Sequence, residues 1–314
     1  MTDRARFGVV GTGPWAHLVH VPAAASSPRV RLAAVYGRDA GRADDLASLA
    51  GADGAVAFDA FDAFLDAVDI VGFAVPPHVQ VPLLERALRA GKHVLVEKPV
   101  AFDPADADRL AAIAADGGLR SVVFFTHRFI PRLELWADDM AVQPWTLARV
   151  ESCSSLRHDA GNPFAASPWR HERGALWDVG PHALARLCGV LGPVIEVSTW
   201  SGEGDHVVLT LEHASGAIAT VSLASDMVAP PPAGFSLAGP AGSVTAPAVD
   251  DWIAASRDAY ERALEQLAAE VGGAPAGPCD LAFGAHVTRV LAAAEASAAS
   301  GTPHELTAPS LTGR

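Results

Sequence analysis

The stretch Phe7-Gly8-Val9-Val10-Gly11-Thr12-Gly13-Pro14-Trp15-Ala16 places the pattern G-x-G-x-x-A directly after an expected strand and at the opening of an expected helix. In a nucleotide site, the first glycine permits a tight turn, the second lets backbone approach a pyrophosphate, and the alanine keeps helix and strand close. The amino end of the helix also offers N–H groups and a partial positive charge to an anion. An ordinary glycine turn has the same sequence, so the surroundings must decide. The candidate cofactor-binding residues of this turn are Gly11, Thr12, Gly13, Pro14 and Trp15.

The surroundings alternate short apolar runs with helical patterns through the first third of the chain. Continuous apolar strands with helices between them indicate a parallel sheet that is covered on both faces. We therefore predict an α/β, doubly wound Rossmann domain over residues 1–124, which favours a nucleotide site at the turn. Strands are expected at 6–10, 30–36, 70–74, 93–97 and 121–125, and helices at 15–26, 40–49, 79–90 and 104–115.

The pattern changes after about residue 126, where strand-like runs follow one another with few helices between them. Such runs, separated by turn residues, are typical of an antiparallel sheet. Residues 125–314 are therefore predicted to form an α+β domain with a mostly antiparallel open sheet, which binds substrate and supports oligomerisation. Strands are expected at 146–151, 196–199, 207–211 and 217–225, followed by long helices at 250–271 and 281–297.

Composition excludes several classes of function. A chain of 314 residues is long enough for two cores, and its net charge of -13, with 23 Lys and Arg and no basic run, argues against a nucleic-acid surface. The three cysteines, Cys153, Cys188 and Cys279, are far apart and lack metal-ligand spacing, so neither zinc nor a disulfide framework is predicted. No apolar run reaches the length of about 20 residues that a membrane span needs. We expect a soluble protein of the cytoplasm without a bound metal.

The end of the second expected strand, Val35-Tyr36-Gly37-Arg38-Asp39, bears on the choice of dinucleotide. An acidic residue at this point accepts hydrogen bonds from the ribose of NAD. Here Gly37 occupies that position and Arg38 follows it, which removes a repelling carboxylate and supplies a partner for a 2′-phosphate. NADP(H) is therefore favoured. NAD(H) stays possible, because Arg38 can be an ordinary loop residue and Asp39 can still reach the ribose.

The apolar strand at 93–97 leads directly into Glu97-Lys98-Pro99. A lysine at the carboxyl end of a parallel strand lies where open α/β sheets bind their ligands, so Lys98 can face the nicotinamide side of a cleft. Pro99 restricts the turn that follows. A surface lysine at the end of a strand is the other interpretation.

A second pair of polar residues lies in the Gly174–His182 stretch, where Asp178 and His182 are four residues apart near an expected helix start. That spacing allows both side chains to lie on one helix face, and Pro181 is compatible with a first turn. An imidazole beside a carboxylate suits proton transfer at neutral pH. A buried structural hydrogen bond is the alternative.

Taken in order and spacing, the Gly11 turn, Val75-Pro76-Pro77, the 87–94 run and Glu97-Lys98-Pro99 resemble the N-terminal signature of the glucose-fructose oxidoreductase, inositol dehydrogenase and MocA (Gfo/Idh/MocA) family. The resemblance continues through Arg128–Pro131, Trp169-Arg170 and 174–182, and so covers most of the chain. It implies an NAD(P)-dependent dehydrogenase or reductase that acts on CH–OH groups. The substrate would be a sugar, a polyol or a related small molecule.

The resemblance also implies roles for individual residues. His182 matches the family's general acid/base, Lys98 the lysine that polarises or protonates the substrate oxygen, and Asp178 the aspartate that orients the substrate hydroxyl or the histidine. A hydride would then move between the nicotinamide and the carbon of a secondary alcohol or carbonyl. Further cofactor-binding residues are Gly37, Arg38, Pro76, Glu97 and Lys98, and the substrate-binding residues are Lys98, Arg128, Trp169, Arg170, Asp178 and His182.

The chain departs from the family at several points that bear on substrate. Ala185 stands where many relatives carry a second aspartate, Gln80 stands where many carry a histidine, and the loop after Trp169-Arg170 is short and keeps one glycine. The identity of the substrate is therefore not transferable, and the bulk of Trp169 and Trp177 either favours a less polar substrate or belongs to the core.

Other functions and the oligomeric state stay open. One alternative is an NAD-dependent glycosidase-type relative, and another is a non-catalytic dinucleotide-sensing regulator. The joint presence of Lys98, Asp178 and His182 argues against the regulator and against a purely structural protein. We expect a homo-oligomer, a dimer or tetramer, because such open sheets often bury a face against another subunit.

Overall fold

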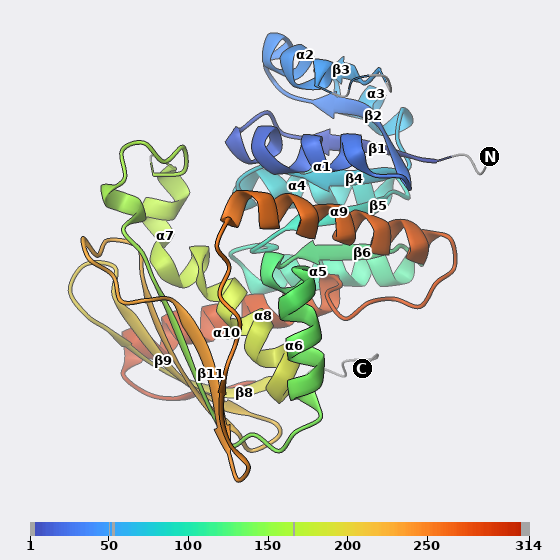
Figure 1. Ribbon diagram of the computed structural model, residues 1–314. Helices are drawn as coiled ribbons and strands as arrows, with labels where there is room; N and C mark the ends of the chain where they lie inside the picture. The colour runs from blue at the N-terminus through green and yellow to red at the C-terminus, as the bar shows by residue number, and fades with distance from the viewer. Residues whose placement is uncertain (1–3, 50, 52–53, 166, 309–314) are drawn as a thin grey trace. The chain divides into compact units, whose positions relative to one another are not determined.

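The structure, a computed structural model, describes residues 4–49, 51, 54–165 and 167–308 (Figure 1). It divides into two compact units, and each is described by itself. The described residues of the first unit lie within 1–130 and 250–285, and those of the second within 131–249 and 286–310. Both units are therefore built from two separate stretches of the chain.

The first unit contains a six-stranded parallel sheet in the order β3-β2-β1-β4-β5-β6. This is the strand order of dinucleotide-binding sheets, and it confirms the predicted Rossmann fold. Central strands such as β4 are buried at every residue, as their continuous apolar sequence predicts. The strands are β1 (Ala5–Val10), β2 (Val30–Tyr36), β3 (Val56–Phe58), β4 (Ile70–Phe73), β5 (His93–Glu97) and β6 (Ser121–Phe124).

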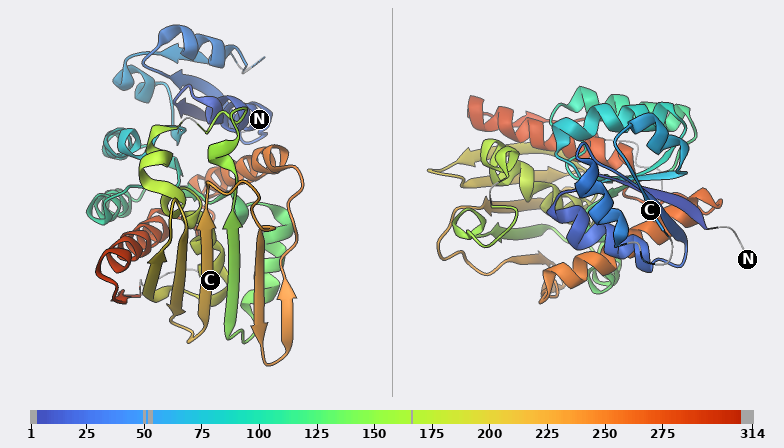
Figure 2. Two further views of the ribbon diagram at one scale, coloured as in Figure 1. Left: turned by 90° about the vertical axis from the view of Figure 1, so that its left-hand side faces the viewer. Right: turned by 90° about the horizontal axis from the view of Figure 1, so that it is seen from above.

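Helices cover both faces of this sheet: α4 packs beside α5 on one face, and α1 beside α9 on the other (Figures 1 and 2). The predicted helix at 15–26 is observed as two consecutive segments, the π-helix η1 (Ala16–His20) and the α-helix α1 (Val21–Ser26). The short elements β3 and α3 were not predicted, because three and six residues are too few for a period to show. The other helices are α2 (Ala40–Ser48), α3 (Phe61–Asp66), α4 (Pro77–Arg89), α5 (Pro104–Asp116) and the 3-10 turn η3 (Thr126–Arg128).

The helix α9 (Trp252–Val271) belongs to the first unit, although the predicted division at 124/125 assigned it to the second domain. It packs against α1 and β6, and its Tyr260 is fully buried with its ring edge-on to Phe124 at 4.9 Å. Periodicity predicts that a segment is helical but not which sheet its apolar stripe covers. The predicted ranges 1–124 and 125–314 therefore differ from the compact units of the structure.

The second unit contains a seven-stranded sheet in the order β12-β11-β7-β10-β9-β8-β13. The pair β7 and β10 is parallel and all other pairs are antiparallel, so the predicted mostly antiparallel sheet is confirmed. The strands are β7 (Leu147–Cys153), β8 (Val194–Ser201), β9 (Val207–His213), β10 (Ile218–Ala224), β11 (Gly234–Gly239), β12 (Gly242–Thr245) and β13 (His304–Glu305).

The helices of the second unit gather on one face of its sheet, while the other face carries none of them over the described residues (Figure 2, left). They include α6 (Pro131–Ala141), α8 (Gly180–Leu191) and the second-unit part of α10 (Leu281–Ser300), whereas α7 (Pro168–Asp178) and the 3-10 turn η4 (Leu156–His158) lie toward one end of the strands. The prediction of few helices in this region was wrong for α6.

Over the described residues, no helix combines the length and the apolar character needed to cross a membrane. The same residues contain no group of three or more His, Cys, Asp or Glu side chains arranged to hold a metal ion.

Candidate cofactor and catalytic sites

The glycine-rich turn after β1 has the backbone geometry of a nucleotide cradle. Gly11 has φ +114°, and a Cβ there would lie 2.5 Å from the carbonyl oxygen of Ala74, so only glycine fits. At Gly13 a Cβ would meet no other atom within 4 Å, which leaves the backbone open to a ligand from that side. These residues fit a dinucleotide pyrophosphate, which approaches backbone N–H groups at such a turn.

The end of β2 carries a glycine where an NAD site carries an acidic side chain. A Cβ on Gly37 would lie 2.6 Å from Cγ2 of Thr12, so a larger residue would require the Thr12 side chain to move. Asp39 is occupied locally, because its Oδ1 accepts the backbone N–H of Arg42 at 3.1 Å and caps α2. Arg38 is exposed.

A second guanidinium, which the sequence interpretation missed, lies beside the same turn. Nη2 of Arg42 donates to the carbonyl oxygen of Thr12 at 3.2 Å. The only sequence signal was its position four residues after Arg38. The edge of the turn therefore carries the guanidinium of Arg42, and the carboxylate of Asp39 nearby is used in capping.

Glu97, predicted as a cofactor-binding residue, connects β5 to the segment that follows the turn. Its Oε1 accepts the indole N–H of Trp15 at 2.6 Å and lies 2.9 Å from Nε2 of His20. His20 is fully buried, and its ring stacks on that of Tyr260 with centroids 4.0 Å apart. Burial, helped by the nearby Glu97 charge, raises the pKa of Tyr260 well above its usual value, so the hydroxyl keeps its proton.

Gln80 holds the turn that carries Lys98. Its side chain is fully buried, and its Nε2 lies 2.9 to 3.2 Å from the carbonyl oxygens of Glu97, Pro99 and Val100. Its Oε1 accepts the backbone N–H of Glu97 at 3.2 Å. The residue that the sequence comparison treated only as a departure from relatives therefore secures the chain on both sides of the lysine.

The remaining predicted residues of the first unit lie near the ends of its strands. Lys98 is half-buried directly after β5, as predicted, and its peptide bond to Pro99 is cis. Pro76 is exposed at the start of α4, where its carbonyl accepts the N–H groups of Val79 and Gln80. Arg128 is half-buried in η3, after β6.

In the second unit, Asp178 and His182 lie on either side of a helix junction. Asp178 is the last residue of α7, and His182 lies in the first turn of α8, which begins at Gly180. Pro181 explains the break, because it has no N–H to continue the hydrogen bonding of α7. Its expected place in a first helical turn is confirmed.

Arg170 and Asp178 are brought together within this unit. Nε of Arg170 lies 3.1 Å from Oδ1 of the buried Asp178, and the guanidinium stacks over the Trp169 ring at 4.6 Å. Trp177 is fully buried and Trp169 is 7% exposed, so both contribute to the core of the unit. The structure therefore favours the core interpretation of these two tryptophans.

Arg186, one helical turn beyond His182, adds a half-buried positive charge that the sequence interpretation missed. Its guanidinium lies over the Phe235 ring at 4.7 Å, and burial lowers its pKa to about 10, which still leaves it charged at neutral pH. Residues four apart on a helix share a face, so this charge lies on the His182 side of α8. The preceding Ala185 is fully buried.

Two family descriptions match the chain: "Oxidoreductase family, NAD-binding Rossmann fold" over residues 5–125, and "GFO/IDH/MocA C-terminal domain" over residues 146–245. A dTDP-3,4-didehydro-2,6-dideoxy-alpha-D-glucose 3-reductase from Streptomyces antibioticus is 33% identical over 196 residues, which are 61% of this chain and 58% of that protein. The match thus spans less than two thirds of that relative.

Two further similarities extend over more of the chain. A D-xylose 1-dehydrogenase (NADP(+)) 2 from Haloferax volcanii is 30% identical over 230 residues, which are 70% of this chain and 69% of that protein. The crystal structure of GenD2 from gentamicin A biosynthesis, in complex with NAD, has a TM-score of 0.80 at 25% identity and covers 98% of both chains. Since both units match the two domains of one family, this chain belongs to the Gfo/Idh/MocA family of oxidoreductases.

Proposed function

We propose that this protein is an NADP(H)-dependent oxidoreductase that transfers a hydride between the nicotinamide and a secondary alcohol or carbonyl carbon of a sugar-like molecule. The observation that carries the proposal is the Gly11 to Gly13 turn, which is open to a ligand at the head of a dinucleotide-type sheet. The presence of Lys98, Asp178 and His182 in a member of this family supports the chemistry.

The preference for NADP(H) rests on the end of β2. Gly37 has no side chain that could repel a 2′-phosphate, and Asp39 is engaged as the cap of α2. Arg38 and Arg42 supply two guanidinium groups, which suit a 2′-phosphate. The Haloferax volcanii relative is named for NADP(+), whereas GenD2 was crystallised with NAD, so relatives alone do not decide the choice.

The bound nicotinamide would supply or accept the hydride. The ammonium of Lys98 would polarise the substrate oxygen, and His182 would exchange a proton with it as general acid or base. Asp178, held by Arg170, would orient the substrate hydroxyl or the imidazole. Together, the three residues would orient the reacting oxygen of the substrate and transfer its proton.

The proposed substrate class is based on two relatives that are 33% and 30% identical to this chain over the matched residues. The Streptomyces antibioticus relative is named as a reductase of a deoxysugar nucleotide and the Haloferax volcanii relative as a pentose dehydrogenase. Both names describe chemistry at a hydroxyl or carbonyl carbon of a sugar. We therefore place the substrate among free or nucleotide-linked sugars and related polyols.

The first experiment titrates the protein with NADPH and with NADH, following nicotinamide fluorescence. We expect tighter binding of NADPH, and Arg38→Ala should weaken it about tenfold by removing a charged hydrogen bond while leaving NADH unchanged. Arg29→Ala, at the opposite end of β2, is the matched control and should change neither affinity. Failure to bind either nucleotide would refute the oxidoreductase proposal.

A screen of sugars and sugar ketones then separates the remaining functions. Net oxidation or reduction of NADP(H) in proportion to product supports a dehydrogenase. Glycoside cleavage without net cofactor turnover would indicate the glycosidase-type alternative. Binding of nucleotide without turnover of any compound would favour the regulator.

We also propose a homo-oligomer in the cytoplasm. The strand residues Trp200 and Val208 are cross-strand neighbours and are 60% and 43% exposed, which is unusual for apolar side chains of this size unless another surface covers them. Light scattering should give a multiple of the 32.4 kDa chain mass, and Trp200→Ser should lower it. A single-chain mass for the wild type would refute the oligomer.

A further inference from the structure

The helix α7 is broken four residues before Asp178. Gly174 has φ 68° and ψ −172°, which is far from helical geometry, so α7 consists of a first arm up to Arg173 and a second arm of Ala175–Asp178. Such a break leaves N–H groups after it and carbonyl groups before it without helical partners. A second arm of one turn is too short to be stable by itself. Contacts from elsewhere must therefore set the direction of the arm that carries Asp178.

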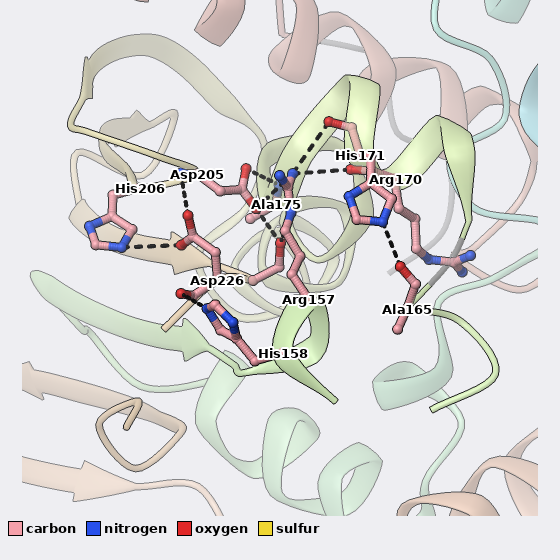
Figure 3. Close-up of polar contacts among 10 residues, drawn as sticks. Arg157, His158, Ala165, Arg170, His171, Ala175, Asp205, His206 and Asp226 are labelled. Carbon is pink, nitrogen blue, oxygen red and sulfur yellow. Dashed lines mark hydrogen bonds and ion pairs between the residues drawn. The ribbon is translucent and has the colours of Figure 1, made fainter. Parts of the chain in front are cut away.

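Asp205, in the connection between β8 and β9, caps the second arm from a distance. Its side chain is buried, and its Oδ1 accepts the backbone N–H of Ala175 at 2.9 Å (Figure 3). The hydroxyl of Ser225 donates to Oδ2, and the carboxylate of Asp226 accepts the backbone N–H of Asp205 at 2.9 Å. This is the hydrogen bond of a helix N-cap, supplied by a residue that is 30 positions away in sequence.

Arg157, in η4, contacts both Asp205 and the first arm. Its Nη2 lies 3.3 Å from Oδ2 of Asp205, and the same nitrogen lies 3.4 Å from the carbonyl oxygens of Arg170 and His171 (Figure 3). Its Nε donates to Oγ of Ser225 at 3.0 Å. One ion pair therefore spans the break: the carboxylate binds the N–H that follows it and the guanidinium binds carbonyls that precede it.

The two arms meet again at Asp178. Arg170 belongs to the first arm and Asp178 to the second, and their side chains are 3.1 Å apart. Any change in the angle between the arms would change that pair and the direction of the Asp178 carboxylate. A Cβ on Gly174 would collide with Oδ1 of Asp205, so the glycine and the carboxylate are matched to each other.

We infer that Arg157 and Asp205 act as positioning residues that set the angle of the break in α7 and thereby the orientation of Asp178 toward substrate and His182. The inference rests on the proposed function, in which Asp178 and His182 act on the substrate oxygen. Desolvation offsets much of the stability that such a buried ion pair gains, so geometry is the better explanation of its presence.

A first experiment, which needs no substrate, tests the contacts that Arg157 and Asp205 make across the break in α7; these contacts are called the clamp below. Amide hydrogen exchange over residues 175–178 is compared among the wild type, Asp205→Ala and Asp205→Asn. Loss of the cap should raise exchange in Asp205→Ala about fivefold to tenfold. Asp205→Asn keeps an oxygen for the Ala175 N–H and should stay close to the wild type. His206→Gln is the control, because Nε2 of His206 lies 3.2 Å from Oδ1 of Asp226 and no contact drawn in Figure 3 joins His206 to α7. Unchanged exchange in Asp205→Ala overturns the inference.

A second experiment tests the consequence for catalysis. With an active substrate, Asp205→Ala and Arg157→Gln should lower kcat between about tenfold and hundredfold, since small misplacements of a catalytic group have effects of this size. The affinity for NADPH should not change, and the pH profile of kcat should shift in these variants but not in His206→Gln. A folded Asp205→Ala with the wild-type kcat and pH profile overturns the inference.

The two experiments keep the inference separate from the proposed function. A wild type that binds NADPH but turns over no substrate refutes the proposed function, while hydrogen exchange still decides whether the clamp exists. If Asp205→Ala does not fold, Arg157→Gln replaces it, with Asp205→Asn again expected to resemble the wild type. Normal exchange and normal kcat in Arg157→Gln would then overturn the inference.

Discussion

The glycine-rich turn after β1 and the α7–α8 junction present two ways of building a site. The turn depends on backbone conformation, since Gly11 has a positive φ and its neighbours leave no room for a Cβ. The junction depends on side chains from distant segments, since Arg157 and Asp205 satisfy the backbone on both sides of the break at Gly174. A site of the first kind is recognisable from a motif. A site of the second kind is recognisable only once the chain is folded.

The largest expected effect is at Lys98, which, like the glycine-rich turn, was recognisable from a sequence motif. Lys98→Met should lower kcat about a thousandfold, because it removes the group that polarises or protonates the substrate oxygen. Lys92, at the other end of β5, is the only other lysine of the chain, and its Nζ donates to the Val68 carbonyl. Lys92→Met should keep the activity of the folded enzyme. Equal losses in both variants would mean that Lys98 has no special role.

A second prediction concerns acid stability and the second unit. Burial, together with the charges of Arg289 and His213, lowers the pKa of the fully buried His286 to about 4. Because its unfolded pKa is about 6.5, the unfolded state binds more protons between these values, so stability is complete above pH 6.5 and falls as the pH drops toward 4. The loss should reach no more than about 3 kcal/mol.

Urea unfolding at pH 7.5 and at pH 4.5 measures this loss. His286→Met, which cannot be protonated, should be less sensitive to acid than the wild type, whereas His206→Gln, at a half-exposed histidine, should behave like the wild type. The same acid sensitivity in wild type and His286→Met would assign the effect to other groups.

A third prediction separates the two glycines of the turn. Gly13→Ala should fold normally, since its Cβ meets no protein atom, but it should weaken NADPH binding roughly fiftyfold, on the order of 2 kcal/mol, by occupying the space of the pyrophosphate. Gly11→Ala should lose both binding and thermal stability, because of its φ of +114°. Thermal melts and fluorescence titrations distinguish the two. Normal binding by Gly13→Ala would contradict the cradle.

The smallest effect is expected at Gln80, which combines both kinds of site. Gln80→Met should keep the shape of the side chain but remove its hydrogen bonds to the Glu97–Val100 turn, and so lower kcat about tenfold through a misplaced Lys98. Gln80→Glu keeps the acceptor for the Glu97 N–H and tests whether the donors matter. A kcat for Gln80→Met within about twofold of the wild type would mean that Gln80 acts only through packing.

Much of the first unit was predictable because its signals are local. Continuous apolar runs predicted five of its strands, and β5 was predicted at its observed bounds. The sequence did not predict that α9 packs in the first unit, because the apolar face of a helix does not specify which sheet it will cover. The roles of Gln80 and Arg42 were also missed, since one bonds to backbone 17 to 20 residues away and the other to a carbonyl 30 residues away.

In the second unit, the sequence correctly placed Pro181 in a first helical turn but did not indicate that two helices meet between Asp178 and His182. The structure separates them by a junction, because a proline cannot donate the N–H that would continue α7. The Arg170–Asp178 pair joins two residues that the family resemblance implied as substrate-binding.

The sequence by itself determined the family, the parallel dinucleotide-type sheet and the glycine turn. These depend on residue type, spacing and backbone sterics, which a linear pattern contains. Only the tertiary structure decided that α9 completes the first unit, that Gln80 secures the Lys98 turn, and that Arg157 and Asp205 hold the break before Asp178. These depend on hydrogen bonds between segments that are far apart in sequence, and such bonds exist only after the chain has folded.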